Sequence, residues 1–74
     1  MEVNVELDLR RLLCPMPVIK TQNALKKMTA GEHLKVTCTD PGVKHDIPAW
    51  CKINGYAILE QLEVDNEFIF VIKA

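Results

Sequence analysis

The 74-residue sequence lacks the patterns that mark a dithiol redox centre, a phosphate-binding loop or a membrane span. Its three cysteines lie far apart and no C-x-x-C occurs, so neither a disulfide-exchange motif nor a metal site is indicated. Its three glycines are not clustered, which excludes a glycine-rich phosphate loop. No apolar run approaches the roughly 20 residues of a transmembrane helix. We therefore expect no metal, no cofactor and no membrane association.

Aromatic residues and net positive charge are also scarce. The chain has one tryptophan, one tyrosine and two phenylalanines, too few for a base-stacking platform, and its formal net charge is −1. We therefore expect no direct contact with nucleic acid. The charges are nevertheless segregated: five positive charges and one negative charge fall in residues 10–32, whereas four negative charges and one positive charge fall in residues 60–74. The basic stretch suits an acidic protein partner.

Length and composition indicate one small globular domain spanning residues 1–74. Hydrophobic residues make up 49% and charged residues 26% of the chain, an ordinary globular balance. A chain of this length buries about 60% of its unfolded surface, which is sufficient for a small core. Residues 1–4 are acidic and alternating, unlike a signal peptide. We expect a cytoplasmic, monomeric protein with reduced cysteines.

Hydrophobic periodicity predicts the element order βαβαββ. Strands are predicted at residues 3–9, 33–39, 56–64 and 68–72, and helices at residues 15–29 and 47–54. Gly31 and Gly55 are the expected helix stops, and Asp65-Asn66 is the expected hairpin turn. Helical crossovers make the first two strands parallel, and the third is expected to run the same way. Cys38 and Cys51 fall on apolar faces and are predicted to lie in the core.

Cys14-Pro15-Met16-Pro17 lies where the first strand gives way to the first helix. With Cys14 as the N-cap, both prolines fall in the first turn, where their missing N–H groups cost little. The Met16 N–H is then free to donate to the sulfur, and the helix N-terminus and nearby cations lower the thiol pKa. This pattern predicts a reactive Cys14. The alternative is a proline-stiffened helix start with a structural, buried cysteine.

The loop after the second strand supplies further candidate residues. The carboxyl ends of parallel strands share one edge of a sheet, so Asp40, His45 and Asp46 can approach Cys14. His45 is a candidate base for the thiol. The alternative gives both aspartates turn and capping roles, with Asp46 as the N-cap of the second helix, and leaves His45 on the surface.

Met16 and Ile19 lie off the apolar arc by which the first helix faces the core. An apolar pair beside a candidate reactive thiol suggests a docking patch for a partner. The positive charges of Arg10, Arg11 and Lys20 fall in the same stretch and complete the predicted docking face. The alternative is an irregular helix end in which Met16 fills a gap.

The sequence Cys14-Pro15-x-Pro17, at a strand-to-helix junction, resembles the CPxP motif of the TusA-like (SirA-like) sulfur carrier family. The surrounding residues agree in order and spacing over nearly the whole chain: Leu7-Asp8, Leu25, Met28-x-x-Gly31-Glu32, Asp40-Pro41, Asp46-Ile47 and Gly55. This resemblance implies a two-layer α/β sandwich, in which a four-stranded mixed sheet of order 1-2-4-3 has both helices on one face. One position departs from the family: Arg11 stands where members usually carry glycine, which would suit a backbone angle that arginine adopts reluctantly.

The resemblance also implies a function. It implies that Cys14 accepts sulfane sulfur as a persulfide and relays it, with Pro15, Met16, Pro17 and Asp40 in supporting roles. The implied donors are a cysteine desulfurase or a rhodanese-like or DsrE-like sulfurtransferase. The implied outlets, through a sulfur-accepting protein, are tRNA thiolation, molybdenum cofactor work and sulfur oxidation. The alternatives are a thiol-based regulatory or RNA- or protein-binding module without sulfur transfer, and a redox sensor in which Cys14 forms sulfenic acid.

Overall fold

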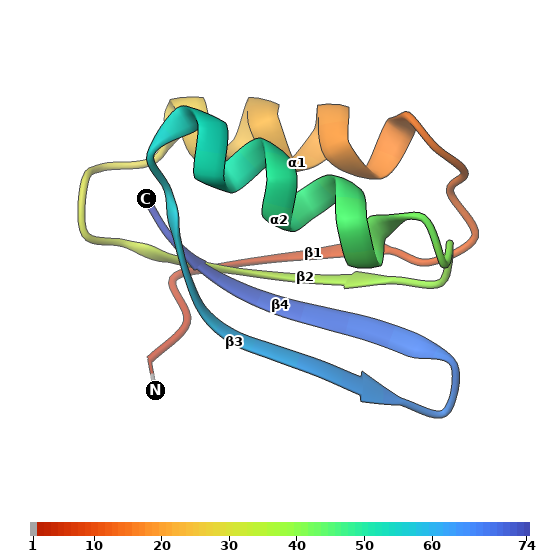
Figure 1. The fold of residues 1–74 in the computed structure, drawn as a ribbon. Coiled ribbons are helices and arrows are strands. Elements are labelled where there is room, and N and C mark those ends of the chain that lie inside the picture. Colours follow the sequence, from red (N-terminus) through yellow and green to blue (C-terminus); the bar gives the residue numbers. More distant parts are fainter. Residues whose placement is uncertain (1) are drawn as a thin grey trace.

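The chain forms two layers, a four-stranded sheet and a pair of helices that cover one of its faces (Figure 1). The structure, a computed structural model, describes residues 2–74. Its elements follow the predicted order: β1 (Val5–Leu9), α1 (Met16–Lys27), β2 (His33–Cys38), α2 (Val43–Asn54), β3 (Ala57–Val64) and β4 (Glu67–Lys73). The predicted two-layer α/β architecture is therefore confirmed.

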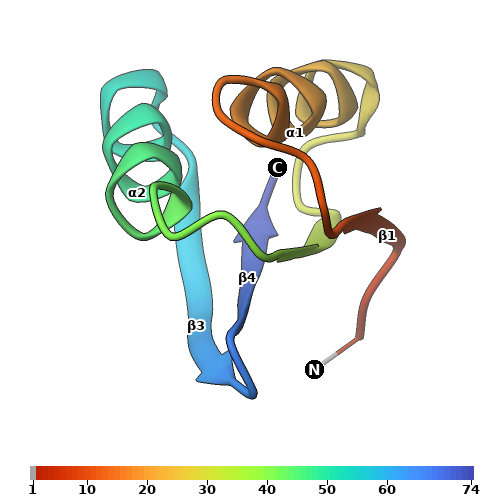
Figure 2. The ribbon, with the colours of Figure 1, turned by 90° about the vertical axis from the view of Figure 1, so that its right-hand side faces the viewer.

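The sheet has the order β1-β2-β4-β3, as the family resemblance implies. β1 and β2 are parallel, with Val5 opposite Leu34 and Leu9 opposite Cys38. β4 is antiparallel to both β2 and β3, so β3 points the same way as β1 and β2. This topology places the carboxyl ends of β1 and β2 side by side, at the end of the molecule that faces the viewer in Figure 2.

The core lies between the sheet and the helices. Alternate residues of β2 and β4 face the helices and are almost entirely buried: Leu34, Val36, Cys38, Phe68, Phe70 and Ile72. Leu25 of α1 and Ile47 and Cys51 of α2 are buried from the other side. Burying a large apolar side chain in this way contributes roughly 1.5–3 kcal/mol. Cys38 and Cys51 are thus core residues, as predicted.

α1 begins one residue later than predicted and ends two residues earlier. Its N-cap is Pro15, not Cys14, and Pro17 occupies the second helical position. The Pro17 side chain is buried in the core, although its position in the sequence indicated only that it fits the first turn. The backbone is already extended at Met28, so the helix stops before Gly31 is reached. Gly31, with a φ of 95°, instead shapes the turn that enters β2.

α2 begins at Val43, four residues before the predicted start, and its N-cap is Gly42. The prediction that Asp46 is the N-cap is therefore wrong. Asp40-Pro41-Gly42 resembles an isolated turn in the sequence, but its carbonyl groups accept N–H bonds from the following residues and lead directly into the helix. Val43 is 1% exposed, so burial of this side chain stabilises the early start. Gly55 ends α2 with a φ of 78°, as predicted.

Asp65 and Asn66 form the predicted hairpin turn between β3 and β4. Their φ values are 50° and 63°, the left-handed conformation that a type I′ turn requires and that Asp and Asn tolerate. The register of β3 against β4 skips Leu59, which lies between Ile58 and Glu60 in a bulge. The bulge interrupts the alternation of side chains along β3, and this explains the irregular hydrophobic pattern of residues 56–64.

Candidate functional site

Cys14 lies in the loop between β1 and α1, and it is the exposed one of the three cysteines. The loop that follows β2 lies beside it, and both loops cross the same end of the molecule (Figure 2). The parallel order of β1 and β2 brings the two loops together, as predicted. An exposed thiol at a sheet end suits reaction with a group carried on another protein.

Asp40 connects the two loops. Its Oδ2 accepts the Cys14 N–H at 2.7 Å, and its Oδ1 accepts the Gly42 N–H at 3.1 Å. A second link runs from the Arg11 N–H to Thr39 Oγ1 at 2.8 Å. The backbone of Cys14 is therefore held by the residues that follow β2.

Arg11 adopts a left-handed backbone conformation, with a φ of 71°. Glycine adopts this conformation freely, whereas for other residues it costs about 1–2 kcal/mol. The expectation that arginine meets an unfavourable backbone angle three residues before the cysteine is consistent with this value. The bond from the Arg11 N–H to Thr39 helps to hold the loop in this shape.

The sulfur of Cys14 contacts a carboxylate. Cys14 Sγ lies 3.4 Å from Asp46 Oδ2, a distance at which the thiol donates a hydrogen bond to the carboxylate. The Met16 N–H, expected to donate to the sulfur, donates instead to the Leu13 carbonyl at 2.9 Å. The pKa of the Cys14 thiol is raised, chiefly by the hydrogen bond to Asp46. Desolvation and the charges of Asp46 and Asp40 raise it further. The predicted lowering of this pKa is therefore wrong.

The other two thiols differ from Cys14 in access to solvent. Cys38 is 0% and Cys51 is 1% exposed. Burial raises the pKa of Cys38 to about 11, with a smaller contribution from the charge of Asp40, and burial raises the pKa of Cys51 to about 11. Both stay protonated at neutral pH. Cys14 is consequently the thiol that a partner can reach.

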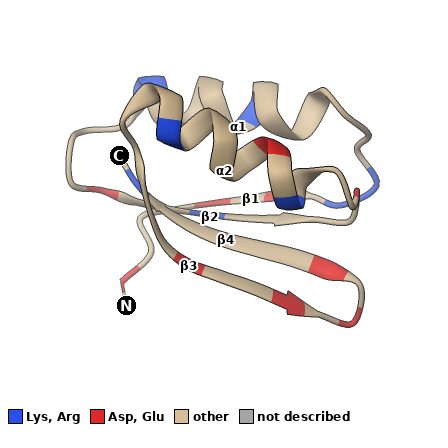
Figure 3. Cartoon of the chain, viewed as in Figure 1, with Lys and Arg blue, Asp and Glu red and all other residues tan. Residues whose placement is uncertain are grey.

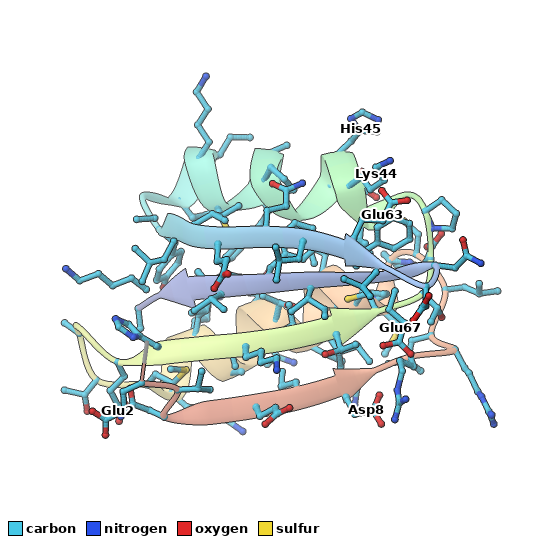
Figure 4. All side chains as sticks on the ribbon, turned by 90° about the horizontal axis from the view of Figure 1, so that it is seen from below. Glu2, Asp8, Lys44, His45, Glu63 and Glu67 are labelled. Carbon is cyan, nitrogen blue, oxygen red and sulfur yellow. The ribbon has the colours of Figure 1, made fainter. Side chains whose placement is uncertain are left out.

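His45 lies on α2 and points away from the sheet toward solvent (Figure 4). Its neighbour Asp46 is the residue whose side chain reaches the sulfur. The interpretation of His45 as a surface residue therefore fits the structure better than its interpretation as a base. Consecutive helical residues point about 100° apart, so the two side chains diverge. A sequence analysis that started α2 at residue 43 would have separated them.

Exposed apolar side chains lie close to Cys14 in the sequence. Met16 is 39% and Ile19 is 40% exposed, so both lie off the core face of α1 as predicted. The sequence analysis missed Leu13, which is 72% exposed beside Cys14, whereas its neighbour Leu12 packs against the core. Two adjacent leucines in a loop do not reveal which one faces inward.

Arg10, one of the predicted docking cations, pairs with carboxylates of the sheet. Its guanidinium lies 2.8 Å from the Asp8 carboxylate and 3.5 Å from that of Glu67, and both acids lie on the sheet face that no helix covers (Figure 4). Hydrogen bonds from Arg10 hold the pKa of Asp8 at about 2. We therefore expect Arg10 to attract a partner less than Arg11 and Lys20 do, and the docking face stays a prediction.

The charge segregation expected from the sequence is visible in space. Acidic residues line β3, the start of β4 and the turn between them, whereas most lysines lie on the helical layer (Figure 3). Lys44 of α2 reaches across to Glu63 of β3 at 3.0 Å, so one helical cation is neutralised locally. The lysines of α1, by contrast, are exposed to solvent, and the loop that carries Cys14 leads directly into this helix.

Among residues 2–74, no three side chains of His, Cys, Asp or Glu gather as a metal-binding group. The expectation of no metal and no cofactor stays a prediction. No helix in this part of the chain is long and apolar enough to cross a membrane.

Known proteins that resemble this chain identify its family. Residues 5–74 match the family described as Sulfurtransferase TusA. The chain belongs to this family. It is 40% identical over 67 residues to YrkI of Bacillus subtilis, a match that covers 90% of this chain and 89% of YrkI. It is 38% identical over 68 residues to the sulfur carrier protein TusA of Allochromatium vinosum, with 92% of this chain and 90% of that protein covered.

A solved structure of the same fold supports the assignment. The crystal structure of a SirA-like protein from Desulfitobacterium hafniense superposes with a TM-score of 0.77 at 27% sequence identity, and 95% of each chain is covered. The resemblance to TusA-like and SirA-like proteins is therefore confirmed, and membership of the TusA family supports a sulfur carrier role.

Proposed function

We propose that this TusA-family chain accepts sulfane sulfur on Cys14, carries it as a persulfide and passes it to an acceptor protein. The observation that carries the proposal is the exposure of Cys14 at the end of the sheet, while Cys38 and Cys51 are 0% and 1% exposed. A single accessible thiol suits the transfer of one sulfur atom, whereas dithiol exchange needs a second cysteine within reach.

The chemistry of loading is a displacement at sulfur. The Cys14 thiolate attacks the outer sulfur of a donor persulfide, a new S–S bond forms, and the S–S bond of the donor breaks. The donor leaves as a thiolate and takes up the proton that Cys14 released. In delivery, a nucleophile of the acceptor attacks the outer sulfur of Cys14-S-SH, and Cys14 leaves as a thiolate that is reprotonated. Neither step needs an external oxidant.

Pro15, Pro17 and Asp40 support this chemistry by fixing the loop. Pro15 caps α1 and Pro17 anchors its first turn in the core. Asp40 holds the Cys14 N–H at 2.7 Å. A loop fixed at both sides presents the sulfur in one position, which lowers the entropic cost of aligning it with a donor persulfide.

The docking face of the carrier comprises the apolar side chains of Leu13, Met16 and Ile19 with the positive charges of Arg11 and Lys20. A partner that delivers sulfur brings its own cysteine to Cys14, so its surface covers this neighbourhood. The apolar residues are 72%, 39% and 40% exposed and gain most from being covered. Ile19 and Lys20 come three and four residues after Met16, so each is a neighbour of Met16 on the surface of α1.

A cytoplasmic cysteine desulfurase or a rhodanese-like or DsrE-like protein would supply the sulfur, and an acceptor protein would direct it to tRNA thiolation, the molybdenum cofactor or sulfur oxidation. Each of these donors carries persulfide on a cysteine, which matches the displacement at Cys14. Met16, two residues after Cys14 in the sequence, would then lie against the donor.

Intact-mass measurement after incubation with a cysteine desulfurase and cysteine tests the proposal. We expect the mass to rise by one sulfur atom, and we expect dithiothreitol to reverse the change. An oxygen adduct would have half that added mass and would identify a sulfenic acid instead. The control is Cys14→Ser, which should gain nothing.

The matched controls are Cys38→Ala and Cys51→Ala, which remove buried thiols and should still accept sulfur if they fold. Sulfur found on a peptide that contains Cys38 or Cys51, or persistent loading of Cys14→Ser, would refute the assignment of the site. Absence of loading from each of the three donor classes would refute the proposed relay.

A further inference from the structure

Two carboxylates from the loop after β2 and from α2 converge on Cys14. Asp46 Oδ2 lies 3.4 Å from the sulfur, and Asp40 Oδ2 lies 2.7 Å from the backbone nitrogen of Cys14. They also lie close to each other: a Cβ placed on Gly42 would be 3.5 Å from an Asp46 oxygen and 3.6 Å from an Asp40 oxygen. The sulfur is thus exposed to solvent on one side and faces negative charge on the other.

We propose that Asp46 is a specificity-determining residue that keeps the Cys14 of the free carrier in its thiol form, so that dissolved electrophiles and oxidants react slowly with it. The carboxylate accepts a hydrogen bond from the S–H group at an Sγ–Oδ2 distance of 3.4 Å, and its negative charge opposes a thiolate in the same place. The inference concerns the reactivity of the thiol. Only the biological advantage of this restraint rests on the proposed function: a sulfur relay would load from docked partners and not from dissolved reagents.

The charged groups around the thiol all act in one direction or are already engaged. Asp46 comes from α2 and Asp40 from the loop after β2, and both raise the thiol pKa. On the thiol loop itself, Arg10 is bound to Asp8 and Glu67. The charge of Arg11 acts on Asp8, and it is not among the charges that shift the Cys14 pKa. The carboxylates are therefore the charges that set the ionisation of Cys14.

A docked partner can still react with Cys14, because docking holds its reactive group next to the sulfur. A donor that holds its persulfide against Cys14 has an effective concentration far above that of a dissolved reagent, which offsets a small thiolate fraction. A dissolved alkylating agent or peroxide has no such advantage. The arrangement therefore separates sulfur transfer between proteins from unspecific modification in solution.

Asp46→Asn is the direct test, because asparagine keeps the size of the side chain and removes its charge. The measurement is the rate of Cys14 alkylation by iodoacetamide as a function of pH. The matched control is Asp65→Asn, which removes the same charge from the distant β3–β4 turn and leaves a residue that tolerates the φ of 50° there. Thermal unfolding shows whether each variant is folded.

We expect Asp46→Asn to lower the Cys14 pKa and to speed alkylation at pH 7, while Asp65→Asn matches the parent. Thiolate nucleophilicity falls as the pKa falls, so the gain should be about threefold to fourfold for each unit by which the pKa drops. Asp46→Glu restores a carboxylate and should return the rate toward that of the parent. Unchanged or slower alkylation in Asp46→Asn would overturn the proposal.

A second measurement keeps the proposal testable if Asp46→Asn is poorly folded. The proton shifts of the Cys14 methylene group in the parent protein, followed by NMR from pH 6 to pH 11, should titrate above the ordinary thiol value of about 8.5. Titration at or below that value would overturn the proposal without any substitution.

Sulfur loading separates this inference from the proposed function. We expect Asp46→Asn to load from a cysteine desulfurase at least as fast as the parent. Slower loading together with faster alkylation would mean that Asp46 assists transfer, which contradicts a restraining role. If neither protein accepts sulfur from any donor but Asp46→Asn is alkylated faster, the proposed function fails and the inference about Asp46 stands.

Discussion

The Asp40 carboxylate bridges the N–H groups of Cys14, at 2.7 Å, and Gly42, at 3.1 Å, so one side chain ties the thiol loop to the start of α2. Asp40→Ala leaves both donors without this partner and should lower the free energy of unfolding by roughly 1–3 kcal/mol. Urea denaturation measures the loss. Asp65→Asn, in an exposed turn, is the control for removal of a charge, because asparagine tolerates the φ of 50° there. A change in Asp40→Ala below about 0.5 kcal/mol would show that water replaces the bridge.

Alkylation of the native protein should label Cys14 first. Cys38 and Cys51 are buried thiols whose pKa is about 11, so at pH 8 they are protonated and shielded. The measurement is peptide mass spectrometry after brief treatment with iodoacetamide, and full labelling in guanidinium serves as the reference. Equal labelling of the three cysteines under native conditions would contradict the burial of the core pair.

Pro17→Ala should destabilise the fold by about 2 kcal/mol. The substitution removes two buried methylene groups, each contributing about 0.8 kcal/mol, and frees the unfolded chain, which adds a few tenths. Urea denaturation gives the difference in unfolding free energy. Pro41→Ala is the control, since Pro41 is exposed in the turn before α2. Equal effects of the two substitutions would mean that burial of Pro17 contributes nothing.

Arg11→Gly should stabilise the chain by up to about 1 kcal/mol. The φ of 71° at this position costs arginine about 1–2 kcal/mol, and the extra freedom of glycine in the unfolded state offsets part of the gain. Arg10→Gly is the control, because it loses the ion pairs with Asp8 and Glu67 and gains no relief of backbone strain. Thermal unfolding of the two variants should shift in opposite directions.

The docking face should respond differently to changes in charge and in apolar surface. Substituting Arg11 and Lys20 with serine should slow sulfur transfer from a desulfurase at low salt and leave it near the parent rate at high salt, because screened charges act on encounter. Arg10→Ser, which removes an already paired cation, should have a smaller effect. Substituting Met16 and Ile19 with serine should speed dissociation at either salt concentration. Normal transfer by both double variants would place the partner on the Asp40–His45 side.

Much of the fold was predictable because its signals are local and consistent. The alternation in β2, the apolar arc of α1 and the Asp65-Asn66 turn each specify their element without long-range information. Parallel pairing of β1 and β2 follows from the crossover, and it correctly brings Asp40 toward Cys14. The strand order came from the family resemblance, since local patterns do not determine which strand enters the centre of a sheet.

The details of the site depend on contacts that a sequence does not display. The boundary of α2 moved by four residues because burial of Val43 outweighed the turn signal before it. That shift turned Asp46 from a cap into the partner of the sulfur and left His45 outside. The direction of the Cys14 pKa shift followed from the same contact. A helix N-terminus beside a thiol predicts a lowered pKa, but a carboxylate at 3.4 Å outweighs it.

Because Cys38 and Cys51 are buried, the folded chain offers one thiol to other sulfur compounds. Any disulfide formed under native conditions must therefore join Cys14 to a second molecule. Oxidation of the carrier alone ends at a covalent pair of identical chains, glutathione adds once, and a trapped donor forms a one-to-one adduct. The mass of a disulfide-linked product thus gives the number of molecules joined to each chain, and no cysteine has to be substituted first.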